Sequence, residues 1–240
     1  AIPLRNADAV IAVSNDVYGS LVSIGVQKER IFRIPNPVNV AAVKQVGDGR
    51  CDHRWLTAVR SDPCVVCAGR LVYQKGYDLF LSAMRRVNAV CACNAIILGD
   101  GPLRRELEEQ VSDAGLAGRV DMPGIVANPA AYFARADAFV LPSRWEGMPN
   151  VLLEAAASGA PLVAADCPGG SREILEALDG GLLVAPESAE ALASAILDCI
   201  KQPDAFRVSR QRVQEVYGID QIVDQYRSVI EDMEPEKHAS

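Results

Sequence analysis

The stretch "CVVCAGRLVYQKGYDLFLSAMRRV" (64–87) decides the fold, because a short apolar run is followed by a glycine-bearing loop and then by apolar residues at helical spacing. The run at 64–68 predicts a strand, and 77–87 predicts a helix. The same alternation continues, with strands predicted at 94–99, 119–124, 138–143, 161–166 and 181–186 and helices at 102–116, 129–136 and 150–158. Strands that alternate with helices predict right-handed crossovers and a parallel sheet. Because the runs are continuously apolar, we expect an α/β fold of Rossmann-like type with helices on both faces of the sheet.

The flanking regions divide the chain further. Residues 1–40 repeat the pattern in miniature, with strands predicted at 9–14 and 30–38 and a helix at 15–25. Residues 46–63 are polar and not periodic, which indicates an exposed linker. We expect four parts: an opening unit with a hinge (1–40), a linker or insertion (41–63), the main domain (64–218), and an amphipathic helix with a tail (219–240). The tail at 234–240 is expected to be disordered.

Composition excludes several classes of protein. The formal net charge is −7, so the chain lacks the overall basic character of a nucleic-acid-binding protein. No apolar run reaches the roughly 18 residues of a membrane-spanning helix, and no secretory signal opens the chain. Cys64 and Cys67 lie on one predicted strand with opposite orientation, so we expect buried thiols in a reducing cytoplasm rather than a metal or redox pair. Because the first residue is not Met, we expect a piece of a longer protein.

The corner "EGMPNVLLE" (146–154) carries two carboxylates, separated by seven residues, between a predicted strand and a predicted helix. It therefore lies at the carboxyl edge of the sheet, where open α/β sheets bind ligands. Asn150 is the expected N-cap, and the N–H groups of this helix terminus suit a phosphate, which Gly147 would let approach closely. Glu146 and Glu154 would accept hydrogen bonds from hydroxyl groups. A ligand with hydroxyl groups on both sides of a diphosphate is a nucleotide sugar.

Several motifs, in order along 64–186, resemble one family. The corner, continued by "LEAAASGAPLVA", is similar to the E-x7-E signature of the retaining group-1 glycosyltransferases, which have the GT-B fold. The segments "VCAGRLVYQKGYD" (66–78), "LGDGPLRREL" (98–107), "ADAFVLPSRWEG" (136–147) and "DCPGGSREIL" (166–175) resemble the family too. The resemblance implies that 64–218 is the donor-binding C-terminal domain of a GT-B enzyme and that 1–40 is the end of the acceptor-side domain. Most of that first domain is absent, so we expect the isolated chain to lack the full active site.

The resemblance and the chemistry assign the same catalytic groups. Arg70 and Lys75 follow the first strand of the main sheet, where two fixed cations would stabilise negative charge on a leaving diphosphate. With Glu146, they are the expected catalytic residues. The residues expected to bind the donor are Gly69, Arg70, Lys75, Gly99, Asp100, Ile125, Val126, Glu146, Gly147, Met148, Pro149, Asn150, Leu153 and Glu154.

Individual roles follow from the same reading. Glu154 would bind the ribose diol and Glu146 the sugar hydroxyls. Asp100 is expected to shape a loop beside the base, and Ile125 and Val126 would contact the base through their backbone. Gly169 and its neighbour are interpreted as simple turn residues.

We expect no metal and no other cofactor, because the chain has no D-x-D pair and neither histidine has a predicted ligand partner. His53 is expected to be solvated in its polar loop, and His238 lies in the tail. The nucleotide sugar would be a substrate rather than a cofactor.

Other functions explain less of the sequence. A dinucleotide oxidoreductase would account for "GDGPLR" (99–104), but Arg104 replaces the third glycine of that motif. A glycoside hydrolase uses paired carboxylates, but the helix N-terminus is expected to hold the pKa of Glu154 low, which does not suit a proton donor. A nucleotide-sugar epimerase shares the architecture, and a nucleotide-sugar-binding module without independent catalysis stays open as well.

The expected function is transfer of a sugar, with retention of anomeric configuration, from a nucleotide sugar to a glycan or lipid-linked acceptor bound through the missing domain. A UDP-sugar is favoured over a GDP-sugar because "SRWEGMPN" (143–150) resembles bacterial hexosyl- and hexosaminyltransferases of surface-polysaccharide assembly. The expected location is the cytoplasm or the inner face of the membrane, with the full-length protein able to associate peripherally.

Overall fold

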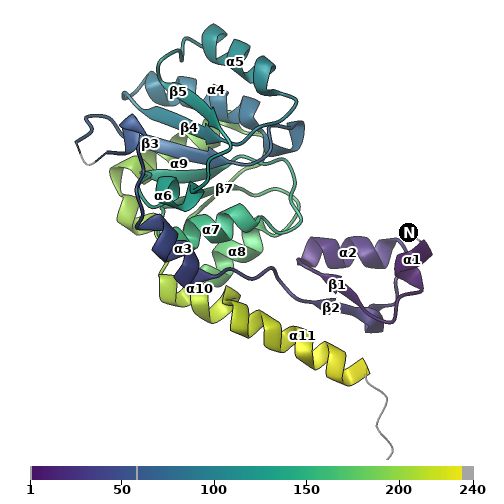
Figure 1. The fold of residues 1–240 in the computed structure, drawn as a ribbon. Helices are drawn as coiled ribbons and strands as arrows, with labels where there is room; N and C mark the ends of the chain where they lie inside the picture. Colours follow the sequence, from purple (N-terminus) through teal and green to yellow (C-terminus); the bar gives the residue numbers. More distant parts are fainter. Residues whose placement is uncertain (1, 58, 234–240) are drawn as a thin grey trace, which may run out of the picture.

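The computed structural model describes residues 2–57 and 59–233, which form two unequal units (Figure 1). The opening unit holds helix α1 (Ile2–Arg5), strand β1 (Val10–Ala12), helix α2 (Asn15–Ser23) and strand β2 (Ile31–Arg33). The strands of the main domain are β3 (Cys64–Ala68), β4 (Asn94–Leu98), β5 (Val120–Gly124), β6 (Ala138–Leu141), β7 (Leu162–Ala165) and β8 (Leu182–Val184). Its helices are α3 (Val40–Gly47), α4 (Tyr77–Asn88), α5 (Arg104–Asp113), α6 (Pro129–Phe133), α7 (Asn150–Ser158), α8 (Ser171–Leu178), α9 (Ala189–Lys201) and α10 (Arg210–Tyr217), and α11 (Ile219–Met233) follows.

The main sheet is parallel throughout, in the order β5-β4-β3-β6-β7-β8. The chain starts in the middle, builds outward to β5, and then returns to build the other half, so the order reverses between β3 and β6. These two strands pair only at Val65 with Ala138 and at Val66 with Phe139, although both continue further. Their carboxyl ends therefore part, which opens the crevice that such a switch point provides for ligands.

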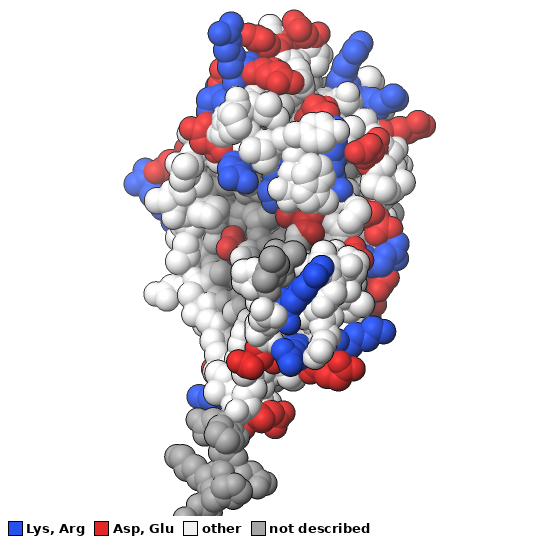
Figure 2. Space-filling view, turned by 90° about the vertical axis from the view of Figure 1, so that its right-hand side faces the viewer, with Lys and Arg blue, Asp and Glu red and all other residues white. Residues whose placement is uncertain are grey.

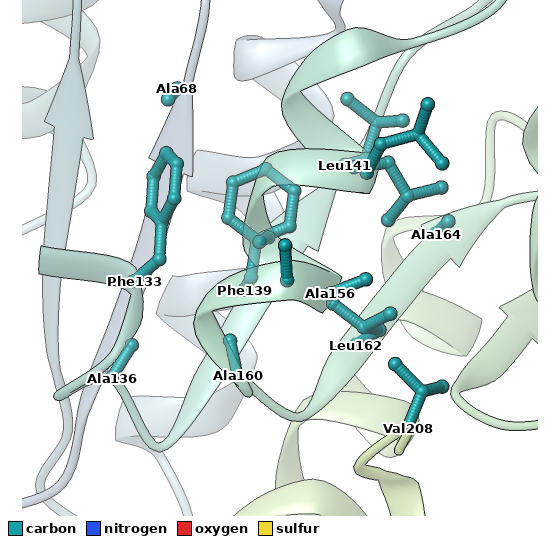
Figure 3. Packing of buried hydrophobic residues seen from close by; sticks show 14 of the residues in the cluster. Ala68, Phe133, Ala136, Phe139, Leu141, Ala156, Ala160, Leu162, Ala164 and Val208 are labelled. Atoms are coloured by element: carbon teal, nitrogen blue, oxygen red, sulfur yellow. The ribbon is translucent and has the colours of Figure 1, made fainter. Parts of the chain in front are cut away.

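Each face of the sheet is buried under its own layer of helices, as the continuously apolar runs predict. Cys64 and Val66 of β3 belong to a core with α3, α6, α7, α8 and α10. Figure 3 shows part of it, with the rings of Phe133 and Phe139 side by side. Val65 and Cys67 point into the other core, with α4, α5 and α9. The predicted α/β fold with helices on both faces is confirmed. Cys64 and Cys67 are both buried free thiols on opposite faces.

The segment 41–63 differs from the exposed linker that we expected. Residues Val40–Gly47 form α3, capped by the Asn39 side chain, which accepts a hydrogen bond from the Ala42 N–H. Leu56 is 3% exposed and lies in the core under α6 and α7. Backbone groups help to dock the segment, since the Arg135 guanidinium donates to the carbonyls of Gly47 and Gly49. Such contacts leave no periodic signal in the sequence.

The opening unit repeats the strand–helix–strand pattern that the sequence predicts, with β1 and β2 parallel. Ser14 caps α2 through its hydroxyl, which accepts from the Val17 N–H. In Figure 1 the unit stands beside the main domain with α11 running below it. Ile222 and Val229 of α11 are buried against Ile34, while other apolar residues of the helix stay partly exposed. The predicted tail at 234–240 lies outside the described residues.

The loops at the carboxyl edge meet backbone to backbone. Gly99, directly after β4, has φ +126°, and a Cβ there would lie 2.0 Å from the carbonyl oxygen of Gly69, directly after β3. No rotamer change relieves such a contact, because both groups belong to the main chain. The loops that leave neighbouring strands can therefore pack this closely only where a side chain is missing.

We predict that Gly99→Ala lowers the free energy of unfolding by about 3 kcal/mol or more, since it combines a backbone clash with an unfavourable φ. Gly118→Ala is the matched control, because Gly118 has φ +80° with nothing within 4 Å of a Cβ. It should cost about 1 kcal/mol, from backbone strain alone. Urea denaturation of both variants measures the difference, and equal losses would show that the close approach does not restrict position 99.

Candidate functional site

The crevice between β3 and β6 holds a buried ion pair. Lys75 follows β3, and its Nζ lies 2.6 Å from Oε1 of Glu146, which follows β6. The two side chains are 17% and 7% exposed, and the Ser143 hydroxyl donates to the same carboxylate oxygen at 2.6 Å. Among the described residues, Oε2 of Glu146 has no hydrogen-bond donor. The carboxylate is thus oriented through one oxygen and keeps the other available as an acceptor.

Arg70 supplies a cation without a protein partner. It is exposed at the mouth of the loop, and in the described part of the chain its guanidinium makes neither a hydrogen bond nor an ion pair. The adjacent Gly69 has φ +152°, and a Cβ there would meet the hydroxyl of Tyr77 at 3.1 Å. Burial, with the nearby Glu146 as a smaller cause, raises the pKa of the Tyr77 hydroxyl well above its ordinary value, so that hydroxyl stays protonated. The structure brings Arg70, Lys75 and Glu146 to one edge, as expected.

The start of α7 corrects the predicted cap. Asn150 is the first helical residue rather than the N-cap, which is Pro149 and offers no side-chain acceptor. The Asn150 Oδ1 accepts a hydrogen bond from Asn36 of the hinge instead, and Asn36 also donates to the carbonyl of Met148. The side chain that we expected to satisfy the first N–H groups of α7 is thus engaged elsewhere. The Leu152 N–H donates to the Pro149 carbonyl, whereas the N–H groups of Asn150 and Val151 have no acceptor among the described residues and stay available to an anion.

The side chains of the corner divide into two groups. Gly147 is exposed and leaves the approach to α7 open. Met148 and Pro149 are buried, and Leu153 is fully buried in the core of the α7 face. The structure therefore does not bring the Leu153 side chain to the open edge; it anchors α7 beneath the site.

Glu154 lies in a mostly apolar cavity of about 230 Å³ between α7, α3 and α6, lined also by Val43, Val46 and Pro129. Burial raises the pKa of its carboxyl group. The expectation that the helix terminus holds this pKa low is wrong, because Glu154 is the fifth residue of the helix and the dipole effect fades within the first turn. Desolvation, which favours the neutral acid, is the larger effect. A half-buried carboxylate with room in front of it is suited to accept hydrogen bonds from a ligand.

The loop after β4 has a local structural role. Oδ1 of Asp100 accepts from the N–H of Gly101 and from Nε of Arg104, both at 2.8 Å. The hydrogen bond from Arg104, followed by the one from Gly101, lowers the pKa of the Asp100 carboxyl. Arg104, which stands where a dinucleotide motif has glycine, also donates to the carbonyls of Gly99 and Met122. It thereby ties the loop to β5.

The loop after β5 carries the two residues expected beside a base. Ile125 is 84% exposed, so its side chain packs against nothing substantial. Val126 is half-buried against the core of the α7 face. Both lie at the same sheet edge as Gly99, which agrees with backbone contact to a ligand.

Three residues that support the Glu146 corner were not predicted from the sequence. Gly169 has φ +123°, and a Cβ there would lie 2.1 Å from the carbonyl oxygen of Glu146, so this turn supports the corner directly. The Gly169 N–H donates at 2.6 Å to the carboxylate of Asp16 in the opening unit. Ser143, beneath Glu146, is the third. The glycine pair "GG" at 169–170 could have indicated a tight turn in the sequence. Asp16 lies 153 residues from Gly169 in the chain, and no sequence pattern indicates its role.

His53 is also not where we expected it. Its side chain is 8% exposed, and its Nε2 lies 2.8 Å from the Asp121 carboxylate on β5. The ring packs against Trp55 and Tyr132. The residues next to His53 in the sequence are polar and indicated an exposed loop, and its partner Asp121 is 68 residues further along the chain. No group of three or more His, Cys, Asp or Glu side chains suited to a metal occurs among residues 2–57 and 59–233.

Comparison with known proteins agrees with this geometry. The sequence profile of the family described as Glycosyl transferases group 1 matches residues 62–202, more than half of the chain. The chain belongs to the group 1 glycosyltransferases. A curated relative, the lipopolysaccharide core biosynthesis mannosyltransferase LpsB of Rhizobium meliloti, is 33% identical over 217 residues, which cover 80% of this chain and 55% of the relative.

A second relative, the GDP-mannose-dependent alpha-(1-6)-phosphatidylinositol monomannoside mannosyltransferase of Mycobacterium tuberculosis, is 34% identical over 155 residues, 59% of this chain and 39% of the relative. The solved structure of Anabaena HepE in complex with UDP shares the fold, with a TM-score of 0.85 at 24% identity, covering 97% of this chain and 66% of HepE. This glycosyltransferase chain spans about half the length, or less, of the curated relatives named here. None of the helices in its described residues is long and apolar enough to cross a bilayer.

For this glycosyltransferase we predict that Lys75→Ala lowers the free energy of unfolding by about 3 kcal/mol, because it leaves the Glu146 carboxylate buried without its cation. The double variant Lys75→Met with Glu146→Gln should recover most of that loss, since it removes both charges and keeps the volume.

The exposed pair of Lys44 and Asp48 provides the control. Lys44→Ala should cost at most about 0.5 kcal/mol, as is usual for exposed pairs. The measurement is urea denaturation of the four proteins. A loss in Lys75→Ala no larger than that in Lys44→Ala would contradict the burial of the pair.

Proposed function

We propose that the chain binds the nucleotide-sugar donor of a retaining sugar transfer and holds the donor's diphosphate at the switch point. The observation that carries this proposal is the placement of two carboxylates, Glu146 before the N-terminus of α7 and Glu154 in its second turn, in different environments. Glu146 keeps one acceptor oxygen in the crevice. Glu154 is desolvated in an open cavity one and a half turns along α7.

The donor would lie along the carboxyl edge of the sheet, with its ribose at Glu154 and its sugar at Glu146. Its ribose diol would enter the cavity and donate to Glu154, since a charge-assisted hydrogen bond is strongest in a desolvated site. Its diphosphate would lie over the N-terminus of α7, with Arg70 beside it. Its sugar hydroxyls would then reach the free oxygen of Glu146. The base would lie toward the loops after β4 and β5, where Ile125 is exposed; the N–H and carbonyl of Gly99 are already bonded to Gly124 and Arg104.

The transfer step breaks the bond between the anomeric carbon and the diphosphate oxygen, which leaves with the bonding electron pair. A bond forms from that carbon to the acceptor oxygen, and the proton of the acceptor hydroxyl passes to the departing diphosphate. Negative charge grows on the departing diphosphate, and Arg70, Lys75 and the α7 N–H groups are positioned to stabilise it. Lys75 is held by Glu146 before any ligand arrives, so it needs no reorganisation. We propose that the protein's own cations serve here and that the reaction needs no metal ion.

The base is proposed to be uracil, although one observation favours a second candidate. The named mycobacterial relative depends on GDP-mannose, whereas HepE was solved with UDP. A guanine nucleotide is therefore the alternative, and direct competition between UDP and GDP for this chain separates the two. A nucleotide-sugar epimerase would change the donor without any acceptor, so donor incubated alone distinguishes that activity.

We predict opposite signs for binding and stability in Glu154→Gln. Because burial raises the pKa of Glu154, the native chain holds this proton more tightly than the unfolded chain does, so ionisation above the ordinary carboxyl pKa costs stability. Glu154→Gln should raise the free energy of unfolding at pH 7. It should also weaken UDP binding by about 1.5–3 kcal/mol, roughly tenfold or more, since a charged acceptor is lost.

Calorimetry with UDP and with its 2′,3′-dideoxy analogue, together with urea denaturation, measures both effects. The affinity gap between the two nucleotides should close in Glu154→Gln. If the variant discriminates between them as well as the parent does, the ribose is bound elsewhere.

We predict further that Arg70→Ala weakens UDP binding about tenfold, because it removes a charge-assisted contact to the diphosphate. Arg105→Ala, on the outer face of α5 with a 91% exposed side chain, is the matched control for net charge. Affinity for UDP should fall with rising salt and stay unchanged with a chelator. Binding that disappears with EDTA and returns with Mg²⁺ would overturn the metal-free proposal.

A further inference from the structure

Two exposed aromatic side chains flank the buried ion pair. Tyr73 precedes Lys75 by two residues and is 60% exposed; Trp145 directly precedes Glu146 and is 46% exposed. Their ring centroids lie 6.1 Å apart at an interplanar angle of 52°. Aromatic residues make up only 5% of the chain, so two neighbouring exposed rings beside the crevice are an unusual use of such residues. We call this pair the aromatic platform.

Arg144 holds the platform rigidly from below. Its side chain is 8% exposed and binds Asp78 of α4 in a bidentate manner, at 2.8 and 2.6 Å. It also donates to the Tyr73 carbonyl at 2.9 Å, and its guanidinium carbon lies 3.9 Å from the centroid of the Tyr73 ring. One face of that ring is thus covered, and its exposure comes from the remaining face and edge.

Two hydrogen bonds hold the backbone that carries the second ring. Gln74 donates through Nε2 to the Trp145 carbonyl at 2.8 Å, and the Arg144 N–H donates to the Gln74 carbonyl at 2.8 Å. The two loops therefore move as one body. A surface that is already ordered loses little conformational entropy when a ligand binds.

The platform lies on the far side of the ion pair from the proposed nucleotide. Arg144 is anchored to α4, and its Nε lies 3.4 Å from Glu187, just before α9; both helices cover the second face of the sheet. Glu154 and its cavity belong to α7 and α3, on the first face. A donor whose ribose meets Glu154 and whose sugar meets Glu146 ends before it reaches Trp145. A sugar ring bound beyond Glu146, at Trp145, would therefore belong to a molecule other than the donor.

We propose that Tyr73 and Trp145 stack against a pyranose ring of the acceptor glycan. A pyranose presents a face of C–H bonds to an aromatic ring, while its hydroxyls need polar partners at the rim, and Gln74 and Glu187 stand there. A two-ring surface matches one sugar residue and is too small for a stable protein interface. The inference rests on the proposed function, because the position of the donor defines which side the acceptor must take.

The experiment measures binding of maltotriose, mannotriose and triacetylchitotriose by saturation-transfer NMR in the presence of saturating UDP. Tyr73→Ala and Trp145→Ala should each weaken the bound trisaccharide roughly fivefold or more, as expected for loss of a stacked ring, and leave UDP affinity within about twofold. Tyr226→Ala on α11, which removes another part-exposed tyrosine, is the control and should change neither affinity.

A second readout uses Trp145 itself. The chain has two tryptophans, so Trp55→Phe leaves Trp145 as the single indole. Its fluorescence should shift to the blue when the trisaccharide binds, and the shift should be absent when UDP binds alone. At trisaccharide concentrations well below the dissociation constant, where occupancy is proportional to affinity, Tyr73→Ala should reduce the shift by about the same factor as the affinity.

The outcomes separate the two proposals. If platform variants lose UDP affinity, or lose UDP-glucose affinity while UDP is unaffected, the rings bind the base or the donor sugar, and the acceptor assignment is overturned. Binding of none of the three trisaccharides would also overturn it. If Arg70→Ala and Glu154→Gln leave UDP binding untouched while the platform variants still weaken the trisaccharide, the donor assignment fails and the glycan platform stands.

Discussion

The site depends on how closely the loops at the carboxyl edge can approach one another. The backbone at Gly99 packs on the carbonyl of Gly69, and the backbone at Gly169 packs on the carbonyl of Glu146. These contacts leave no room for a Cβ, so they fix the loops more strictly than side-chain packing does. They also determine where Lys75 and Glu146 meet, because those side chains project from the same loops. The two side chains are therefore held where they are only 17% and 7% exposed.

Much of this arrangement could be predicted from the sequence, since the signals are local. Continuous apolar runs alternating with helical patterns gave the parallel sheet with two covered faces, and the Glu146–Glu154 spacing indicated a corner at the ligand edge. What could not be predicted depends on contacts across long stretches of chain. Leu56 is buried through a docked loop without periodicity, and His53 is paired with an aspartate on β5. The residues adjacent to Leu56 and His53 in the sequence do not indicate either of these contacts.

The error about Glu154 has a different cause. The sequence places it on the helix that begins at the corner, and a helix terminus lowers carboxyl pKa values. The structure shows that the residue is already in the second turn and faces a cavity closed on one side by α3, a helix that we took for linker. Desolvation is a tertiary effect, and here it outweighs the local one. The free chain accordingly keeps a destabilising carboxylate at the place where we propose that a ligand binds, as is common for binding residues.

The hydrogen bond from Gly169 to Asp16 joins the corner to the opening unit. Because Gly169 also lies against the backbone of Glu146, this one turn contacts both the opening unit and the Glu146 corner. If a ligand moved the Glu146 backbone, it would disturb this contact, and by reciprocity a change in the contact would alter the affinity for that ligand. The turn would act as a mechanical link, through which the orientation of one unit is communicated to the charges of the other.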